Sequence, residues 1–139
     1  MNEPNVLIVD DEKDYLETLK KRLQKRGLEI TAIENGKEAL EWLINNSVDV
    51  VLLDVRMAGL DGIQVLREIK KRYPLTEVIM LTGHASTEVA IEGMELGAFD
   101  YLMKPVDFDE LLYKIQDAHK KKSIQEEKIR GMKKLVTGK

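Results

Sequence analysis

The sequence contains no cysteine, and this absence removes several kinds of chemistry at once. Without a thiol, the chain forms no disulfide, holds no metal through thiolate and uses no cysteine as a nucleophile. We expect a cytoplasmic location, because cytosolic proteins rarely depend on disulfides. Any reactive site must therefore be built from oxygen and nitrogen side chains.

Long hydrophobic runs and targeting signals are also absent. No apolar stretch is long enough to cross a bilayer, and the first residues show no basic region followed by an apolar one. The 139 residues are 43% hydrophobic and 34% charged, which is typical of one globular domain. We expect a single buried core and no association with a membrane.

Charge is divided unevenly along the chain. Residues 119–139 contain eight Lys or Arg and two Glu, a balance of +6, whereas residues 1–118 contain 14 basic and 23 acidic residues, a balance of −9. The acidic body lacks the clustered Lys and Arg that neutralise phosphates, which argues against direct nucleic-acid binding. We assign residues 1–120 to a globular domain and residues 121–139 to a basic helical linker or tail.

Strand and helix signals alternate along the sequence. Strands are predicted at residues 6–9, 28–33, 50–54, 78–81 and 98–103. Helices are predicted through residues 16–23 up to Gly27, at 36–46, 63–73 and 86–96 with Gly97 as a stop, and from Asp107 onward. This alternation predicts an α/β fold with a doubly wound, five-stranded parallel sheet and helices on both faces.

Polar residues follow four of the predicted strands. The run Val-Val-Leu-Leu-Asp at residues 50–54 predicts a strand buried on both faces that ends in Asp54. Asp10 and Asp11 follow the first strand, Thr82 the fourth and Lys104 the fifth. Each of them alone is explained equally well as a cap or a solvated side chain. Together they favour a shared site, because ligands of open α/β sheets bind beyond the carboxyl ends of strands.

The residue types narrow the chemistry of this site. Neighbouring carboxylates repel one another by about a few kcal/mol at an effective dielectric constant of ~20, so a cation is needed. Oxygen ligands suit Mg²⁺, with Mn²⁺ as the alternative, and zinc is disfavoured because His84 and His119 are not spaced as a metal pair. Lys104 and Thr82 form a cradle for phosphoryl oxygens, and Asp54 can act as a nucleophile that forms an acyl phosphate.

Five short motifs together resemble the response regulator receiver domain of two-component signalling. They are Ile-Val-Asp-Asp-Glu (8–12), Leu-Leu-Asp-Val-Arg-Met (52–57), Leu-Asp-Gly (60–62), Met-Leu-Thr-Gly-His (80–84) and Tyr-Leu-Met-Lys-Pro (101–105). The resemblance covers residues 4–120. It implies a flavodoxin-like fold with strand order 2-1-3-4-5.

The resemblance also implies roles for the residues at the strand ends. Asp54 matches the phosphoacceptor, which takes a phosphoryl group from a phosphohistidine of a sensor kinase or phosphotransfer protein. Asp11 matches the direct Mg²⁺ ligand, Asp10 assists through water, and the backbone carbonyl of Arg56 completes the ligand set. Such a chain is a signalling switch that catalyses only its own phosphorylation and dephosphorylation, so it is not an enzyme in the usual sense.

Further residues match the output side of the switch. Thr82 and Lys104 match the residues that contact the phosphoryl oxygens, and a cis peptide bond is implied between Lys104 and Pro105. Tyr101 matches the aromatic that turns inward when the threonine moves, although an aromatic on a terminal strand is more often plain core. The helix at 86–96, the strand at 98–103 and the last helix then form the surface that reports the state.

Two positions are expected to set the lifetime of the phosphate. Arg56 and His84 stand two residues after Asp54 and Thr82. A bulky cation at Arg56 shields an acyl phosphate from water, which predicts slow hydrolysis. Where many receivers have Met-Pro, this chain has Met57-Ala58, which predicts a less rigid loop.

The tail has two interpretations. Alternating spacings of four and three form a seam typical of a coiled coil, which favours an extended last helix and a dimerising linker: Leu111, Ile115, Ala118, Lys122, Gln125, Ile129, Met132 and Val136. The polar Lys122 and Gln125 and the nearby Gly131 favour the second interpretation, a frayed and solvated tail. A homodimer through this helix or through the output surface is therefore an expectation.

Residues 83–88 and 97–101 most resemble receivers of nitrogen-regulatory transcription activators. The chain would then be the receiver part of a transcription regulator whose output domain is missing. A stand-alone receiver that acts by protein contact is the alternative within this family.

Two other classes remain open. An Asp-nucleophile phosphohydrolase usually carries a second carboxylate two residues on, where this chain has Arg56. A nucleotide or flavin module needs a glycine loop after the first strand, where this chain has Asp-Asp-Glu. Both are disfavoured.

Overall fold

The computed structural model describes residues 3–56, 61–83 and 87–137. Strands and helices alternate along this part of the chain, as predicted. The strands are β1 (Asn5–Val9), β2 (Glu29–Ile33), β3 (Val50–Asp54), β4 (Glu77–Thr82) and β5 (Asp100–Met103). The helices are α1 (Lys13–Lys25), α2 (Gly36–Asn45), α3 (Gly62–Arg72), α4 (Thr87–Glu95) and α5 (Phe108–Thr137).

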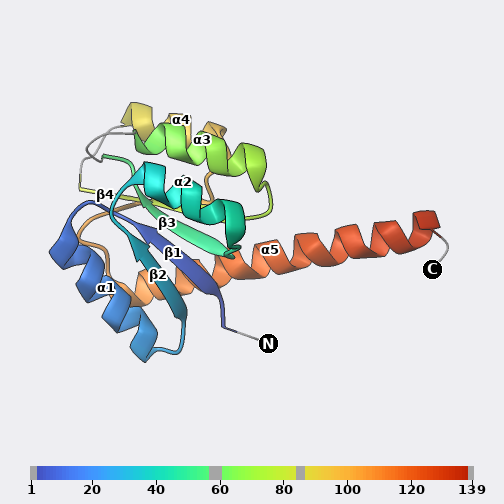
Figure 1. Cartoon of the computed structure of the whole chain (residues 1–139), viewed down its shortest axis with the longest axis horizontal. Coiled ribbons are helices and arrows are strands. Elements are labelled where there is room, and N and C mark those ends of the chain that lie inside the picture. Colours follow the sequence, from blue (N-terminus) through green and yellow to red (C-terminus); the bar gives the residue numbers. More distant parts are fainter. Residues whose placement is uncertain (1–2, 57–60, 84–86, 138–139) are drawn as a thin grey trace.

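The strands form one parallel sheet in the order β2-β1-β3-β4-β5, which confirms the predicted fold class and topology. Helices α2, α3 and α4 lie on one side of the sheet, and α1 and α5 on the other (Figure 1). The strand order reverses between β1 and β3. In open α/β sheets the crevice at such a reversal is the usual place for a ligand.

Side chains of β3 point alternately to the two faces of the sheet, and helices cover both faces. This explains why β3 is apolar up to Asp54. Val50 and Leu52 pack with residues of α1 and α5, whereas Val51 and Leu53 pack with residues of α2 and α3. A strand covered on both faces has no solvent side, so it carries no polar position until its end. The sheet therefore holds Asp54 at the end of a strand that is buried at every position, and Asp54 itself is 5% exposed.

Helix ends follow local chemistry. Asn35 and Asp61 each accept a hydrogen bond from a backbone N–H in the first turn of α2 and α3. Gly27 and Gly97 have φ values of 90° and 103°, so the predicted helix stops after α1 and α4 are confirmed. β5 is shorter than predicted and begins at Asp100, although the N–H of Phe99 already donates to Val78 on β4.

Helix α5 distinguishes the two interpretations of the tail. It continues as one helix to Thr137, so the interpretation as an extended last helix agrees with the structure and the interpretation as a frayed tail is wrong. Its first half packs on the sheet, and its second half projects past the sheet (Figure 1). Lys, Glu, Gln, Leu and Met dominate the projecting part, and these residues favour helix even without tertiary contacts.

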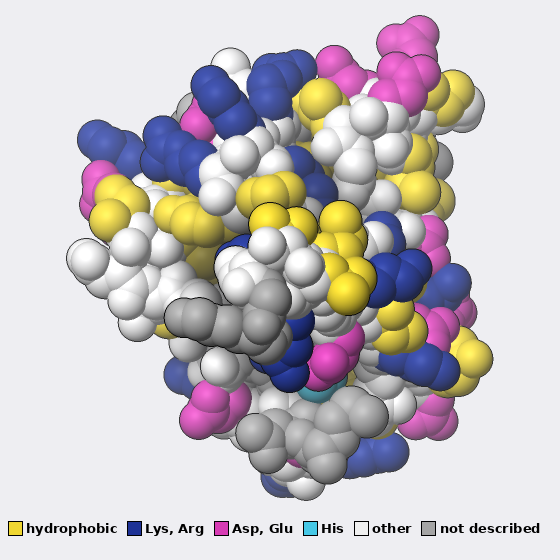
Figure 2. Space-filling model, turned by 90° about the vertical axis from the view of Figure 1, so that its right-hand side faces the viewer, with side chains coloured by type: hydrophobic (Ala, Val, Ile, Leu, Met, Phe, Trp, Pro, Cys, Tyr) yellow, Lys and Arg dark blue, Asp and Glu magenta, His cyan; other side chains and the backbone are white. Residues whose placement is uncertain are grey.

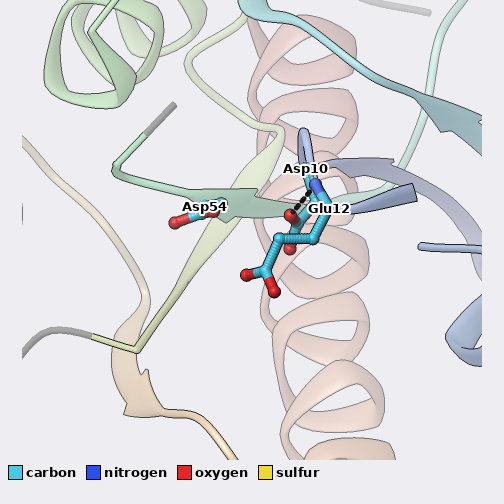
Figure 3. Close-up of side chains that lie close together, drawn as sticks. All are labelled: Asp10, Glu12 and Asp54. Atoms are coloured by element: carbon cyan, nitrogen blue, oxygen red, sulfur yellow. Dashed lines mark hydrogen bonds between the residues drawn. The ribbon is translucent and has the colours of Figure 1, made fainter. Parts of the chain in front are cut away.

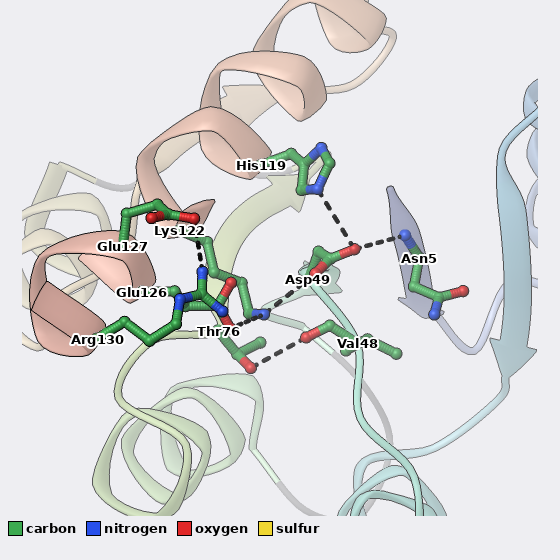
Figure 4. A network of polar contacts seen from close by, with 9 residues as sticks. All are labelled: Asn5, Val48, Asp49, Thr76, His119, Lys122, Glu126, Glu127 and Arg130. Atoms are coloured by element: carbon green, nitrogen blue, oxygen red, sulfur yellow. Dashed lines mark hydrogen bonds and ion pairs between the residues drawn. The ribbon is translucent and has the colours of Figure 1, made fainter. Parts of the chain in front are cut away.

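A network of polar contacts holds α5 where it leaves the sheet (Figure 4). The carboxylate of Asp49, just before β3, lies 3.1 Å from Lys122 Nζ and 3.7 Å from His119 Nε2. Its Oδ2 also accepts a hydrogen bond from the N–H of Asn5 on β1. Lys122 donates to Glu126 one turn further along. The base of α5 is thereby tied to β1 and β3.

The projecting part of α5 exposes apolar side chains. Ile129, Met132 and Val136 are 38%, 63% and 86% exposed. Figure 2 is viewed from the side toward which this end of the helix points, and it shows hydrophobic side chains among Lys and Arg side chains. Within the described residues, no helix is both long and apolar enough to span a membrane.

Candidate functional site

Strand register brings the first two predicted residues together. Val9 of β1 is paired with Leu53 of β3, and each is followed directly by an aspartate, Asp10 and Asp54. Both carboxylates are nearly buried, with relative exposures of 2% and 5%. They come from the two strands that flank the reversal of strand order, and Figure 3 shows them with Glu12 at this edge.

Lys104 comes from the β5 side of the sheet and reaches the acids that follow β1 and end β3. It follows β5, and its backbone N–H donates to the carbonyl of Thr82 at 2.8 Å. Its Nζ lies 2.6 Å from Asp10 Oδ2, 2.9 Å from Glu12 Oε1 and 3.6 Å from Asp54 Oδ2. The Lys104–Pro105 peptide bond is cis, as the resemblance implies. The predicted lysine and both buried acids thus lie together, and we call the place where Asp10, Glu12, Asp54 and Lys104 meet the hollow.

The acidic cluster has a different third member from the one predicted. One carboxylate oxygen from each of Asp10, Glu12 and Asp54 lies within 4.8 Å of the others. Asp11 is exposed and is not in this group of described residues, but its charge acts on Asp54 and raises the pKa of that carboxyl. Glu12 was not singled out from the sequence, although it directly follows the acidic pair.

Burial dominates the electrostatics of Asp54. The pKa of this carboxyl is raised from 3.8 to about 6, and desolvation is the largest cause. A backbone hydrogen bond from Arg56, 3.0 Å to Oδ1, and the charge of Lys104 act in the opposite direction, whereas Asp10 and Asp11 raise the pKa further. Burial therefore outweighs the two stabilising contacts, and the carboxyl of Asp54 is harder to ionise than that of an ordinary aspartate.

Burial lowers the pKa of Lys104, but its hydrogen bonds to Asp10 and Glu12 more than offset this, so the net pKa lies above the ordinary value. The ring of Tyr15 on α1 also lies 4.4 Å from Nζ, close enough for a cation–π contact. Sequence reasoning missed Tyr15. Its only signal was its place in the first helical turn after the acidic residues.

Thr82 and Tyr101 lie where the motifs predict them. Thr82 ends β4 and is fully buried, one residue beyond the pairing of Leu81 with Asp54. Tyr101 on β5 is half-buried and packs against the core on the α2 and α3 side. Met57, Ala58 and His84 lie outside the described residues, so the predictions for the loop and for His84 stay predictions.

Gly62 lets α3 begin close to the end of β3. A Cβ at this position would lie 2.7 Å from the carbonyl oxygen of Asp54 and would overlap the backbone of Val55. Only glycine allows this approach, because real Cβ atoms are not found so near backbone atoms. The glycine of the Leu-Asp-Gly motif therefore has a steric role next to Asp54.

A family model for the response regulator receiver domain matches residues 6–116 of this chain, which is most of its length. The chain belongs to the response regulator receiver family. Its relatives include the DNA-binding transcriptional regulator NtrC of Escherichia coli (strain K12), which is 42% identical over 81% of this chain. They also include the transcriptional regulatory protein ZraR of the same strain, 40% identical over 82% of this chain. This agrees with the predicted nitrogen-regulatory type.

The alignments cover only 24% of the NtrC sequence and 26% of the ZraR sequence, so this receiver matches about a quarter of each relative. Among solved structures, a response regulator receiver domain protein from Clostridium thermocellum is similar. It is 39% identical and has a TM-score of 0.83, and the match covers 87% of this chain and 98% of that one. The fold of this receiver is thus shared over nearly the whole length of that protein.

The donor set of the receiver fits a hard divalent cation. Carboxylate oxygens gather within 4.8 Å, two of the three acids are buried, and neither thiolate nor histidine belongs to the group among the described residues. The raised pKa of Asp54 indicates that desolvation disfavours its charged form. A bound cation would relieve that cost, so the carboxylates of Asp10, Glu12 and Asp54 fit such an ion, whereas the predicted ligand Asp11 is not in this group.

Proposed function

We propose that this receiver is a phosphoacceptor switch in which Asp54 takes a phosphoryl group from a phosphohistidine on a sensor kinase or phosphotransfer protein. The observation that carries the proposal is the convergence of Asp10, Asp54 and Lys104 in one hollow at the reversal of strand order. A carboxylate held at the end of a rigid strand beside a lysine has the geometry of a nucleophile with an electrostatic partner.

In the transfer step, a carboxylate oxygen of Asp54 attacks phosphorus, the P–N bond to the donor imidazole breaks, and an acyl phosphate forms. The N–H of Arg56 already donates to Oδ1, which leaves Oδ2 on the side of Lys104. The Lys104 ammonium then stabilises the phosphoryl oxygens, and the hydroxyl of Thr82 is the second donor.

Asp10, Asp11, Asp54 and the backbone carbonyl of Arg56 would hold Mg²⁺ in this receiver, with Mn²⁺ as the alternative. When bound, the ion supplies positive charge that neutralises the carboxylates and the phosphoryl oxygens. The chain itself contributes two carboxylates that are almost completely buried, those of Asp10 and Asp54.

The switch follows from the added charge. A phosphoryl group brings about one to two negative charges and three acceptor oxygens. Thr82 gains a hydrogen bond by moving toward it, and the half-buried Tyr101 fills the space that the threonine leaves. The surface of α4, β5 and α5 changes as a result and signals to the partner.

The proposal is tested by incubating the chain with acetyl phosphate and Mg²⁺ and following its intact mass. We expect one added phosphoryl group on wild type and none on Asp54→Asn. Rapid multiple turnover of acetyl phosphate without accumulation would instead identify a phosphohydrolase. Addition at another residue would refute the assigned role of Asp54.

We further propose that the receiver acts within a transcription regulator, with an output domain that follows α5. The names of its relatives support this, because NtrC and ZraR are transcriptional regulators and this chain matches about a quarter of each. In this arrangement α5 is the connection along which the state of Asp54 reaches the output domain.

A homodimer through the seam of α5 or through the α4, β5 and α5 surface is part of the same proposal. The side of α5 that packs on the sheet through Ile115 and Ala118 continues past the sheet as Ile129, Met132 and Val136. Analytical ultracentrifugation of Met132→Glu should show a weaker dimer than wild type. Ile124→Glu is the matched control, because Ile124 lies outside the seam; equal dimerisation of both variants would exclude the seam.

A further inference from the structure

The donors of Lys104 are divided among the acids that surround it. A lysine ammonium has three N–H donors and accepts nothing. Its two hydrogen bonds go to Asp10 Oδ2 at 2.6 Å and Glu12 Oε1 at 2.9 Å, while Asp54 Oδ2 lies at 3.6 Å, beyond a hydrogen bond. The lysine is thus more firmly bound by the two acids of the first loop than by the candidate phosphoacceptor.

Asp10 and Glu12, the two hydrogen-bond partners of Lys104, differ in their exposure to solvent. The side chain of Asp10 is 2% exposed, and its other oxygen accepts a hydrogen bond from the N–H of Glu12 at 2.9 Å. The side chain of Glu12 is 64% exposed, so water can solvate its carboxylate as soon as the contact with the lysine breaks. Glu12 can therefore release the lysine at small cost, whereas the buried Asp10 cannot.

We propose that Glu12 is a positioning residue that competes with the phosphoryl group for Lys104. Before phosphorylation, Glu12 holds the ammonium on the β1 side of the hollow. A phosphoryl group on Asp54 carries more charge than one carboxylate, so it takes over the donor that Glu12 releases. This inference rests on the proposed function and adds a regulator of how readily Asp54 is modified.

The ring of Tyr15 helps to keep Lys104 in place when Glu12 releases it. It lies 4.4 Å from Lys104 Nζ, so a favourable contact with the ammonium does not depend on Glu12. Loss of the Glu12 contact therefore leaves Lys104 held by Tyr15 and Asp10. The donor that faced Glu12 then becomes available to the phosphoryl oxygens, in addition to the third donor on the side of Asp54.

The test is calorimetric titration of the full chain with beryllofluoride, a noncovalent substitute for the phosphoryl group, at saturating Mg²⁺. Glu12→Gln removes the competing charge and keeps the shape of the side chain. We expect its affinity for beryllofluoride to rise by about one and a half- to fivefold, the range that an exposed ion pair supports. Loss of phosphate from the acetyl-phosphate-treated variant should slow in the same proportion.

The salt dependence of beryllofluoride affinity distinguishes electrostatic competition by Glu12 from a merely structural role. Because Glu12 is exposed, its pair with Lys104 is screened by salt, so the difference between wild type and Glu12→Gln should shrink as salt rises to about 1 M. Glu17→Gln is the matched control, since Glu17 is an exposed acid on α1 and its loss changes net charge equally.

Two failures are distinguishable. If wild type takes up neither beryllofluoride nor phosphate, the proposed function itself is wrong. If wild type binds and Glu12→Gln matches Glu17→Gln, or binds more weakly than it, the competition is refuted while the phosphoacceptor role of Asp54 stands.

Discussion

Asp54 is subject to opposing influences. Burial at the end of β3 disfavours its charge, while the N–H of Arg56 and the ammonium of Lys104 favour it. Burial prevails, so the carboxyl is harder to ionise than an ordinary aspartate. In the proposed phosphotransfer, a carboxyl that is partly protonated near pH 6 without a cation would gain reactivity when positive charge enters the hollow.

This environment predicts how stability depends on pH. Between pH 3.8 and about 6 the folded chain keeps a proton on Asp54 that the unfolded chain has lost, so the free energy of unfolding falls as pH rises through this window. Asp54→Asn has no carboxyl at this position, so its free energy of unfolding does not fall for this reason. In a chelating buffer, we expect the variant to be more stable than wild type by on the order of 1–3 kcal/mol at pH 7–8.

Urea unfolding of both proteins across pH 4 to 8 measures the effect, with the advantage of Asp54→Asn vanishing near pH 4. An advantage that is constant with pH would show that burial does not shift the titration of Asp54.

Arg56 predicts a slow loss of phosphate. Its side chain is exposed two residues after Asp54, where a long cation would shield the proposed acyl phosphate from attacking water. We expect Arg56→Asn to hydrolyse faster than wild type, measured as the decay of the phosphorylated mass after acetyl phosphate is removed. Arg67→Asn, at an exposed arginine of α3, is the control and should decay like wild type; an unchanged rate in Arg56→Asn would remove the shielding role.

Among the elements, α5 depends on its contacts at the base. Asp49 pairs with His119 and Lys122 just where the helix leaves the sheet, and these side chains are only 14–23% exposed. Asp49→Asn keeps an acceptor for Asn5 but removes the charge. We expect amide hydrogen exchange in residues 122–137 to become about two- to fivefold faster, in line with the loss of one ion pair.

The control for this prediction is Glu127→Gln. Glu127 pairs with Arg130 at 2.7 Å on the exposed side of the same helix, with side chains 73% and 63% exposed. Such a pair contributes little, so exchange should stay unchanged. Equal acceleration in both variants would show that Asp49 has no special place in holding α5.

At the scale of the whole molecule, the repeating patterns of the sequence were sufficient to predict the strands, the helices and the location of the site. Alternation of apolar runs and helical periodicity predicted every strand and helix, and the residues that end the strands predicted the hollow that contains Asp10, Asp54 and Lys104. The order of strands came from the family resemblance. These features are local or are shared by all doubly wound sheets.

What the sequence did not show depends on contacts between distant side chains. Lys104 reaches Glu12 across 92 positions of sequence and packs on Tyr15, and no periodic pattern encodes such a meeting. The same holds for α5, whose polar seam positions suggested fraying. Lys122 is in fact used by Asp49 and Glu126, so a residue that weakens a coiled coil strengthens this helix against its own domain.

The central claim is that charge placed on Asp54 is transmitted through Thr82 and Tyr101 to the surface of α4, β5 and α5. Amide NMR spectra of the ¹⁵N-labelled chain with Mg²⁺, before and after addition of beryllofluoride, test it most directly. We predict that wild type shifts at the hollow and also along α4 and β5, and that Asp54→Asn shows neither change. Shifts that stay within the hollow, or that persist in Asp54→Asn, would contradict the account.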